Sequence, residues 1–352
     1  MKSKLFKYLN LSRARAREGH LPAARQLVEA LYLLAVCGVG PGYYHRARMY
    51  RRDLPFSQKR RYRMGRHYKA IVDRYNPRAY RKISQNKLAE KALFSTYSIP
   101  TARLYGVYHA ESGYATHGAE LCEASDLQAL VRQHGLSRLA VKCVEGFEGR
   151  GFDIVEFDDD RSDELYSTAL ARSLPVGEYL ASRLALSDNC GLILEDAIVQ
   201  HPSLAALNPS SVNTLRMWVT QHGKQARVRS AILKVGAPGS LVDFTTDGGA
   251  YVPVDISTGR LGTPVLRGND LDPDAAAPFS IPPGLTIPYF IEACEAAKRA
   301  LKLFPHTCFA GTDVAITADG PLIVEMNVVP DPIHAATIQT PQLDLLEPLP
   351  DH

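Results

Sequence analysis

The sequence predicts an α+β fold in which helices come first and strands mixed with helices follow. Apolar residues have helical spacing in the early segment 21–36, LPAARQLVEALYLLAV. Further along, the strand-like runs 212–220 and 226–236 flank the turn QHGKQ and predict an antiparallel pair. Antiparallel pairing favours an α+β fold over a doubly wound parallel sheet.

Length and composition indicate a globular protein of two or three domains. The chain has 352 residues, of which 45% are hydrophobic and 22% charged. Six dispersed cysteines show no metal-binding spacing, which fits reduced thiols in the cytoplasm. We expect no signal peptide, because arginines precede the first apolar stretch. The stretch 30–44 has 15 residues, whereas a membrane span needs about 20, so we expect a buried helix there, with an interfacial helix as the alternative.

Positive charge is concentrated in the segment 46–82. It contains fourteen Lys and Arg and two Asp, so its net charge is 14 − 2 = +12, and the remaining chain carries 4 − 12 = −8. Such a segment can bind an anionic partner, either nucleic acid such as tRNA or a membrane surface. The same charges can equally belong to helix faces that are solvated or docked onto the acidic remainder.

The remaining elements are expected at defined positions. The basic region is expected to be helical through Lys69 and to end at Asn76-Pro77, and Ser84 is a candidate N-cap for a helix over 84–97. Further strands are expected at 101–108, 139–144, 152–157, 190–199 and 248–255, further helices at 164–185 and 288–304, and a proline-containing loop at 266–284.

A glycine-rich loop, EGFEGRG, separates two of these strands. Gly146, Gly149 and Gly151 can bring backbone N–H groups close to a phosphate, although a loose hairpin has the same spacing. Lys142 lies inside the apolar run LAVKCV, where an ammonium group is costly unless it meets an anion. Lys87, early in its helix, is a second candidate phosphate contact.

Other polar residues interrupt apolar strands. Glu195 and Asp196 end the run LILED, where they could accept hydrogen bonds from a ligand or simply emerge into solvent. Arg216 interrupts VNTLRMWVT, which suits either a bound anion or a structural ion pair. His334 could touch a substrate, but we expect it at the surface.

The hairpin GTDVAITADGPLIVEMN gives the most specific indication of a binding site. With a three-residue loop, Ala318-Asp319-Gly320, Asp313 lies opposite Glu325, and Asn327 shares the face of Glu325. Three oxygen ligands on one face suit Mg²⁺ or Mn²⁺. A two-residue loop, Asp319-Gly320, would place Asp313 opposite Met326 and break the cluster. Exposed acids at strand ends are the simpler alternative.

Together these segments resemble the ATP-grasp superfamily, and its sugar-transfer-associated, glutamate-ligase-like branch in particular. The resemblance extends from about Ser84 to His334. It rests on the ordered motifs SQNKL, AVK, EGFEGRGF, LILED, VNTLRMWV, DGG at 247–249 and GTDVAIT…LIVEMN. It implies an ATP-grasp fold, in which two α+β subdomains sandwich ATP.

The resemblance also implies roles for single residues. Lys87 and Lys142 would contact the ATP phosphates under a flap formed by the three glycines. Glu195 and Asp196 would lie at the adenine and ribose end. Arg216, together with Lys142, would stabilise the transferring phosphoryl group. The metal ligands would be Asp313, Glu325 and Asn327. The segment after the hinge, QHPSLAALN, lacks the family's usual second acid, and His201 is a weak substitute for it.

The domain organisation implied by the resemblance has five parts. They are a helical basic region (1–83), the N-terminal part of the ATP-grasp module (84–138), a glycine-flap subdomain (139–196), a C-terminal subdomain with the metal site (197–340) and a tail (341–352).

The implied function is an ATP-dependent carboxylate–amine ligase that works through an acyl-phosphate, with ATP and Mg²⁺ or Mn²⁺ as cofactors. Its substrates would be a small-molecule carboxylate and an amine. Three alternatives remain at this stage: a kinase, a carboxylate–thiol or carboxylate–hydroxyl ligase, and a nucleic-acid- or membrane-binding protein that acts through 46–82.

Overall fold

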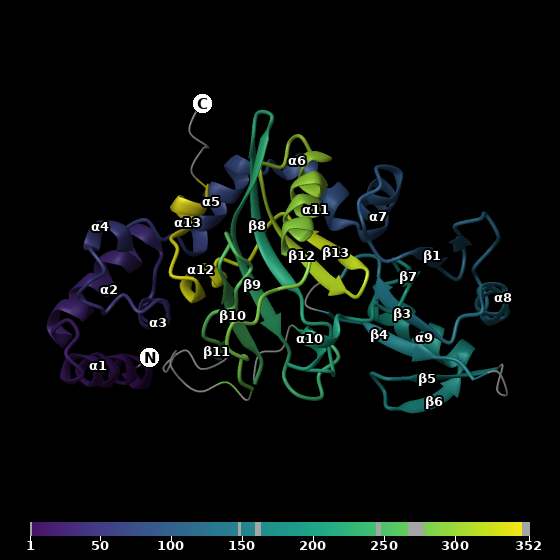
Figure 1. Ribbon diagram of the computed structural model, residues 1–352, viewed down its shortest axis with the longest axis horizontal. Coiled ribbons are helices and arrows are strands. Elements are labelled where there is room, and N and C mark those ends of the chain that lie inside the picture. The colour runs from purple at the N-terminus through teal and green to yellow at the C-terminus, as the bar shows by residue number, and fades with distance from the viewer. Residues whose placement is uncertain are drawn as a thin grey trace.

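The computed structural model describes residues 2–146, 149–158, 163–243, 248–266, 277 and 279–346. Within this part of the chain, two antiparallel sheets lie next to each other and helices of the N-terminal region pack at one end (Figure 1). The predicted α+β class and the helical N-terminal region are confirmed. The first helices are α1 (Lys2–Arg17), α2 (Ala23–Cys37), α3 (Pro41–Arg46), α4 (Phe56–Lys59), α5 (Gly65–Tyr75), α6 (Arg78–Gln85) and α7 (Lys87–Thr96).

The first sheet, here called the N-terminal sheet, has the order β2-β1-β7-β3-β4-β5-β6 among the described residues. Its apolar face packs against α8 (Ala124–His134) and α9 (Val176–Leu186), with Leu127 and Leu180 buried there. Its strands are β1 (Leu104–Tyr108), β2 (Tyr114–Ala115), β3 (Arg138–Cys143), β4 (Asp153–Glu156), β5 (Glu164–Ser167), β6 (Arg172–Pro175) and β7 (Leu192–Glu195).

The second sheet, here called the C-terminal sheet, has the order β11-β10-β9-β8-β12-β13 in the described chain. Side chains alternate along each strand, so one face can be apolar and the other polar. Leu215 and Met217 belong to the core that α11 (Phe290–Lys302) covers, whereas Arg216 between them points to the opposite face. The strands are β8 (Leu215–His222), β9 (Gln225–Val235), β10 (Ala250–Val254), β11 (Val265–Leu266), β12 (Phe309–Thr317) and β13 (Gly320–Asn327).

The N-terminal helices pack against one end of the C-terminal sheet. Their core cluster includes Leu33 and Tyr44 and continues onto Trp218 and Phe309 of that sheet. The short helices α12 (His334–Thr337) and α13 (Gln342–Leu346) complete this cluster, while α10 (Pro202–Ala205) lies between β7 and β8 in the chain. None of the described helices is long and apolar enough to span a bilayer.

The two sheets are joined by the segment that precedes β1. Thr101 pairs with Ile323 of β13 in a parallel bridge, and its hydroxyl donates to the Ile323 carbonyl at 2.8 Å. The Lys91 ammonium of α7 donates to the same hydroxyl at 3.0 Å. These contacts fix the edge of the C-terminal sheet next to α7 and the N-terminal sheet.

Two predicted elements are corrected by the structure. The expected helix over 164–185 is instead the hairpin β5–β6 followed by α9, which begins after Pro175. Buried Asp153 accepts hydrogen bonds from the Ser167 hydroxyl and the Ala169 N–H, and these bonds hold the hairpin. The N-cap of α7 is Asn86, not Ser84: its side chain accepts from Ala89 N–H at 3.0 Å. The expected loop at 266–284 lies largely outside the described residues.

The N-terminal core contains a histidine that should make stability depend on pH. Burial, and then Arg15, lower the pKa of His45 to about 4, from 6.5. Below pH 6.5 the unfolded chain therefore binds a proton that the folded chain rejects, so stability falls as the pH falls from 6.5 to about 4. The loss is on the order of 3 kcal/mol, from 1.36 kcal/mol per unit of pKa difference.

The measurement is the free energy of unfolding of the wild type and of His45→Phe at several pH values. We expect the variant to show a shallower decline between pH 6.5 and 4. Parallel pH profiles for the two proteins would contradict the assignment.

Candidate functional site

A cavity of about 800 Å³ lies between the two sheets. Its walls carry opposite charge. The N-terminal wall presents four cations and three carboxylates (4 − 3 = +1): Lys87, Arg138, Lys142, Arg150, Glu156, Glu195 and Asp196. The C-terminal wall presents two cations and four carboxylates (2 − 4 = −2): Arg216, Lys234, Asp243, Asp313, Glu325 and Asp331.

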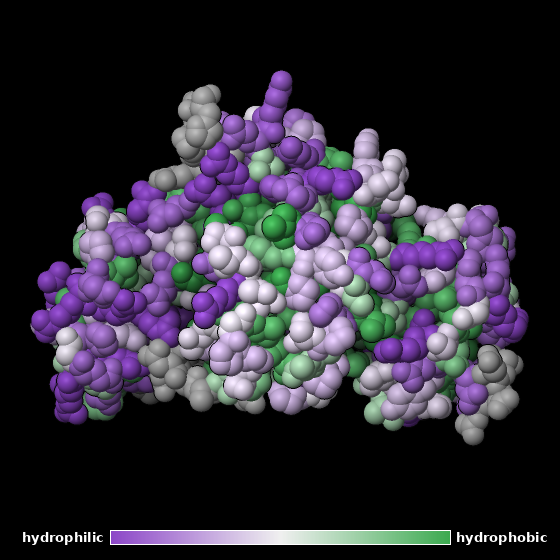
Figure 2. All heavy atoms as spheres, in the orientation of Figure 1, coloured by the Kyte–Doolittle hydropathy of each residue, from purple (hydrophilic) through white to green (hydrophobic). Residues whose placement is uncertain are grey.

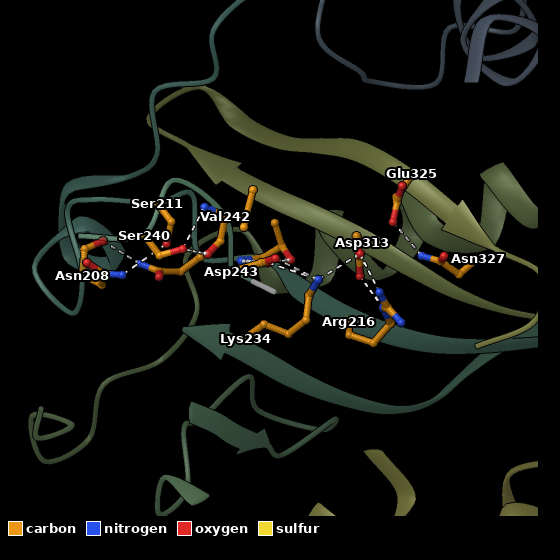
Figure 3. Close-up of polar contacts among 12 residues, drawn as sticks. Asn208, Ser211, Arg216, Lys234, Ser240, Val242, Asp243, Asp313, Glu325 and Asn327 are labelled. Carbon is orange, nitrogen blue, oxygen red and sulfur yellow. Dashed lines mark hydrogen bonds and ion pairs between the residues drawn. The ribbon is translucent and has the colours of Figure 1, made fainter. Parts of the chain in front are cut away.

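The Asp313 carboxylate is the centre of the C-terminal wall (Figure 3). Asp313 lies on β12 directly opposite Arg216 on β8, whose Nη2 donates to Oδ2 at 2.7 Å and whose Nε donates to Oδ1. Lys234 on β9 donates to the same Oδ2 at 3.0 Å. Lys234 also lies 3.2 Å from the Asp243 carboxylate. A row of alternating charges therefore crosses three strands.

Burial and charge act in opposite directions on Asp313. Burial alone would raise its pKa, but Arg216 and then Lys234 outweigh burial and lower the pKa to about 2. Burial would likewise lower the pKa of Arg216, yet Asp313 raises it above its ordinary value. Both groups are charged at neutral pH, as a buried ion pair of good geometry requires.

Glu325 and Asn327 lie at the outer edge of this row. Asp313 is opposite Glu325, as predicted, and the Asn327 amide nitrogen donates to Glu325 Oε1 at 2.9 Å. The predicted three-residue loop is wrong, because Thr317 pairs with Gly320 and the loop therefore has two residues. A bulge at Val324 shifts the register, and Asp313 still lies opposite Glu325.

The predicted three-oxygen cluster is only partly assembled. The Asp313 carboxylate accepts hydrogen bonds from Arg216 and Lys234. The described residues contain no group of three His, Cys, Asp or Glu placed to hold a metal. Glu325 and the Oδ1 of Asn327 form an oxygen pair with no cationic side chain bonded to it in the described part of the chain. Such a pair suits Mg²⁺, which is usually held by one or two carboxylates together with water and phosphate oxygens.

The predicted phosphate lysines occupy the opposite wall. Lys142 pairs with Glu195, which also lies 2.5 Å from Lys91. Lys87 donates to the Gly146 carbonyl at 2.7 Å, at the start of the glycine-rich loop. Burial would raise the pKa of Glu195, but Lys142 and Lys91 lower it. Glu195 therefore positions two ammonium groups, and this differs from the adenine-end role that the resemblance implied.

The glycine-rich loop connects β3 and β4 and forms part of the cavity wall. Gly149 and Gly151 have φ of +72° and +73°, which favour glycine. A Cβ on Gly149 would lie 3.0 Å from Val242 of the opposite wall, and one on Gly151 would lie 2.5 Å from Cys143 Sγ. Gly149 therefore lets the loop pack closely on the C-terminal half, and Gly151 lets it pack closely on β3 of its own half. Phe147 and Glu148 lie outside the described residues.

The remaining predicted residues have mixed outcomes. Asp196 lines the cavity and accepts a hydrogen bond from the Tyr105 hydroxyl at 2.6 Å. His201 is not among the lining residues; its Nδ1 caps α10 by accepting from Ser203 N–H. His334 is buried rather than exposed, lines the cavity and packs against Trp218 and Tyr251. Asp247 of the DGG motif lies outside the described residues.

Sequence reasoning missed three charged residues of this site. Lys234 interrupts the apolar run AILKVG, the same signal that identified Lys142. Asp243 accepts from the Thr214 hydroxyl and had no such signal. Glu90 is buried in α7 and accepts from Met326 N–H at 2.9 Å, between Glu325 and Asn327. Burial, and then Glu325, raise the pKa of Glu90 well above its ordinary value.

The lysine pair around Glu195 makes a prediction about stability. Glu195→Gln leaves the buried Lys91 ammonium and the partly buried Lys142 ammonium without the carboxylate that pairs them, so the free energy of unfolding should fall by about 3–5 kcal/mol. Adding Lys91→Met should restore part of the loss, because it removes one of the two unpaired charges. Chemical denaturation measures both variants.

The matched control is Glu145→Gln, which breaks the exposed Lys82–Glu145 ion pair. It should cost less than about 1 kcal/mol. Equal losses for Glu195→Gln and Glu145→Gln would show that the buried cluster is not energetically distinct.

Comparison with known proteins gives one family match. The sequence model of the family described as sugar-transfer associated ATP-grasp matches residues 66–339, more than half of the chain. No curated protein matches the sequence.

Several solved structures resemble the chain. A biotin carboxylase from Campylobacter jejuni is 12% identical over 85% of this chain and 54% of its own, with a TM-score of 0.49. A carboxyaminoimidazole ribonucleotide synthase from Aspergillus clavatus, complexed with ATP, is 12% identical over 76% and 55%, with a TM-score of 0.41. A D-alanine–D-alanine ligase from Coxiella burnetii is 14% identical over 75% and 55%, with a TM-score of 0.40. The chain thus spans about half the length of these structures.

Proposed function

We propose that the chain, which belongs to the sugar-transfer associated ATP-grasp family, is an ATP-dependent ligase. The proposed reaction joins a carboxylate to an amine. This fold uses ATP with Mg²⁺. The observation that carries the proposal is the opposite charge of the two cavity walls. Lysines face acids across the cavity, as a polyphosphate and its counter-cation require.

The donor set fits Mg-ATP. Glu325 and Asn327 would hold Mg²⁺ through their oxygens, with Asp313 behind them, and the metal would neutralise charge on the phosphates. Lys87 and Lys142 would bind the phosphates from the opposite wall, beneath the loop that contains Gly146, Gly149 and Gly151. The apolar side chains of Ile154 and Ile198 line the cavity near Asp196 and suit a purine ring.

Arg216 is placed to act on the transferring group. Its Nε and Nη2 bond to Asp313, and no hydrogen bond from Nη1 is present among the described residues. Nη1 can therefore donate to a phosphoryl or acyl oxygen without breaking the ion pair. Asp313 and Lys234 would hold the guanidinium in place, so that its charge is preorganised before reaction.

The proposed ligation has two steps. A substrate carboxylate oxygen attacks the γ-phosphorus of ATP, ADP leaves, and an acyl-phosphate forms. An amine nitrogen then attacks the acyl carbon, phosphate leaves with the former carboxylate oxygen, and the amine loses a proton. The protein supplies orientation and charge for these steps and no covalent nucleophile.

The test is a mass-spectrometric screen of amino acids, sugar acids and amino sugars with ATP. An accepted carboxylate is then labelled with ¹⁸O. We expect ADP, an amide product and inorganic phosphate that contains one ¹⁸O atom. Phosphate without label would contradict the acyl-phosphate route, and a stable phosphorylated product would indicate a kinase.

Weakening the metal site should lower turnover strongly without unfolding the chain. Glu325→Gln retains the shape of the side chain and should lower ATP turnover by roughly 100-fold or more, because charge on the phosphates is no longer neutralised. The exposed Asp319 of the hairpin loop provides the control, and Asp319→Asn should leave turnover unchanged. Unchanged turnover in Glu325→Gln, with normal thermal unfolding, would contradict the metal assignment.

A further inference from the structure

The helix α2 presents an apolar face to solvent. Val28, Leu31, Tyr32 and Ala35 have the spacing of one helix face, and all four are exposed. The exposed fraction is 67% for Val28 and 61% for Leu31. Leu34 and Val36 extend the exposed apolar surface on its flanks. We call this surface the α2 apolar face.

The orientation of α2 is fixed by a polar contact on its other side. Glu29 is buried and its Oε2 lies 2.7 Å from the buried Lys59 ammonium. The Tyr44 hydroxyl donates to the same carboxylate at 3.0 Å, and Gln26 donates to the Leu21 carbonyl at 2.6 Å. Thus α2 buries its acid and its amide and exposes its apolar residues. Rotating the helix would leave a buried charge unpaired, so the exposed face is a fixed property of the fold.

A basic side chain lies beside the α2 apolar face, and further basic residues lie on α2 and on the neighbouring α1. The Arg60 guanidinium lies 5.8 Å from the centre of the Tyr32 ring, and Arg25 lies on α2 itself with an exposed side chain. The neighbouring α1 contains six Lys and Arg and no acid. Residues 1–45 carry seven cations and two acids, a charge of +5, so residues 1–82 carry 5 + 12 = +17. Figure 2 shows hydrophilic side chains gathered at the end of the molecule where α1 and α2 lie.

We infer that α2 docks on an anionic lipid bilayer, with its apolar face at the level of the acyl chains and the arginines on the headgroup phosphates. A helix with apolar residues on one side and basic residues nearby has the character of an interfacial helix. Long arginine side chains can reach the headgroups while the helix lies in the surface. A second copy of the chain fits less well, because a two-fold interface through α2 would place the same basic residues against each other.

The docking surface is separate from the cavity between the sheets, since none of the described side chains of α1 or α2 lines that cavity. Docking on a bilayer would determine where the chain acts, and it is independent of the proposed reaction.

The experiment is flotation of the full chain with phosphatidylcholine vesicles that do or do not contain phosphatidylglycerol. We expect binding only to the anionic vesicles, and weaker binding at high salt. Leu31→Asp should weaken binding by at least about tenfold, because it removes an inserted side chain and adds a negative charge. Arg60→Ala should weaken binding by roughly fivefold through loss of one headgroup contact.

The matched control is Ile291→Asp, which alters an isoleucine that is 74% exposed on α11. It should bind vesicles like the wild type, and all three variants should retain ATP turnover and thermal unfolding temperature. Three outcomes would overturn the inference: no binding by the wild type, equal loss in Leu31→Asp and Ile291→Asp, or a wild-type dimer in sedimentation that Leu31→Asp dissociates.

Discussion

The buried contact of Asp313 with Arg216 and Lys234 is the interaction on which the rest of the site depends. Three neighbouring strands each contribute one charged residue to the same face, and the opposite face of those strands packs against α11. A charged residue on a buried face is tolerated only when a partner of opposite charge is in contact. The sheet can therefore have a polar face because Asp313 pairs with both cations and Asp243 supplies a second negative charge beside Lys234.

This arrangement has a consequence for the edge of the sheet. Since Asp313 bonds to both cations, Glu325 is left to the Asn327 amide, its hydrogen-bond partner among the described residues. On the facing wall, Glu195 lies between Lys91 and Lys142 in the same arrangement, one acid between two cations. Each carboxylate positions charged groups for the cavity, and the two walls are left with opposite net charge. Such a cavity can hold phosphates and a divalent cation without reorganising the protein.

Much of the fold and part of the site could be predicted from the sequence. Alternation located β8, β9, β12 and β13, and the acids in GTDVAIT and LIVEMN identified Asp313 and Glu325. The predicted length of the loop between β12 and β13 was wrong, because a bulge at Val324 compensates for a shorter turn. A bulge has no clear signal in the sequence. The helix expected at 164–185 failed because Asp153, distant in sequence, binds Ser167 and holds a hairpin. Lys234 and Lys142 carry the same signal, a lysine within an apolar strand, whereas Glu90 needs the tertiary structure to be recognised.

The most direct test of the central claim is a crystal structure of the chain with Mn²⁺ and a non-hydrolysable ATP analogue, in which anomalous scattering locates the metal. We predict that the metal lies between the nucleotide phosphates and the oxygens of Glu325 and Asn327, at roughly 2.0–2.3 Å from them. We also predict that Arg216 remains bonded to Asp313. A metal bound elsewhere, or a nucleotide bound outside the cavity between the sheets, would contradict the assignment.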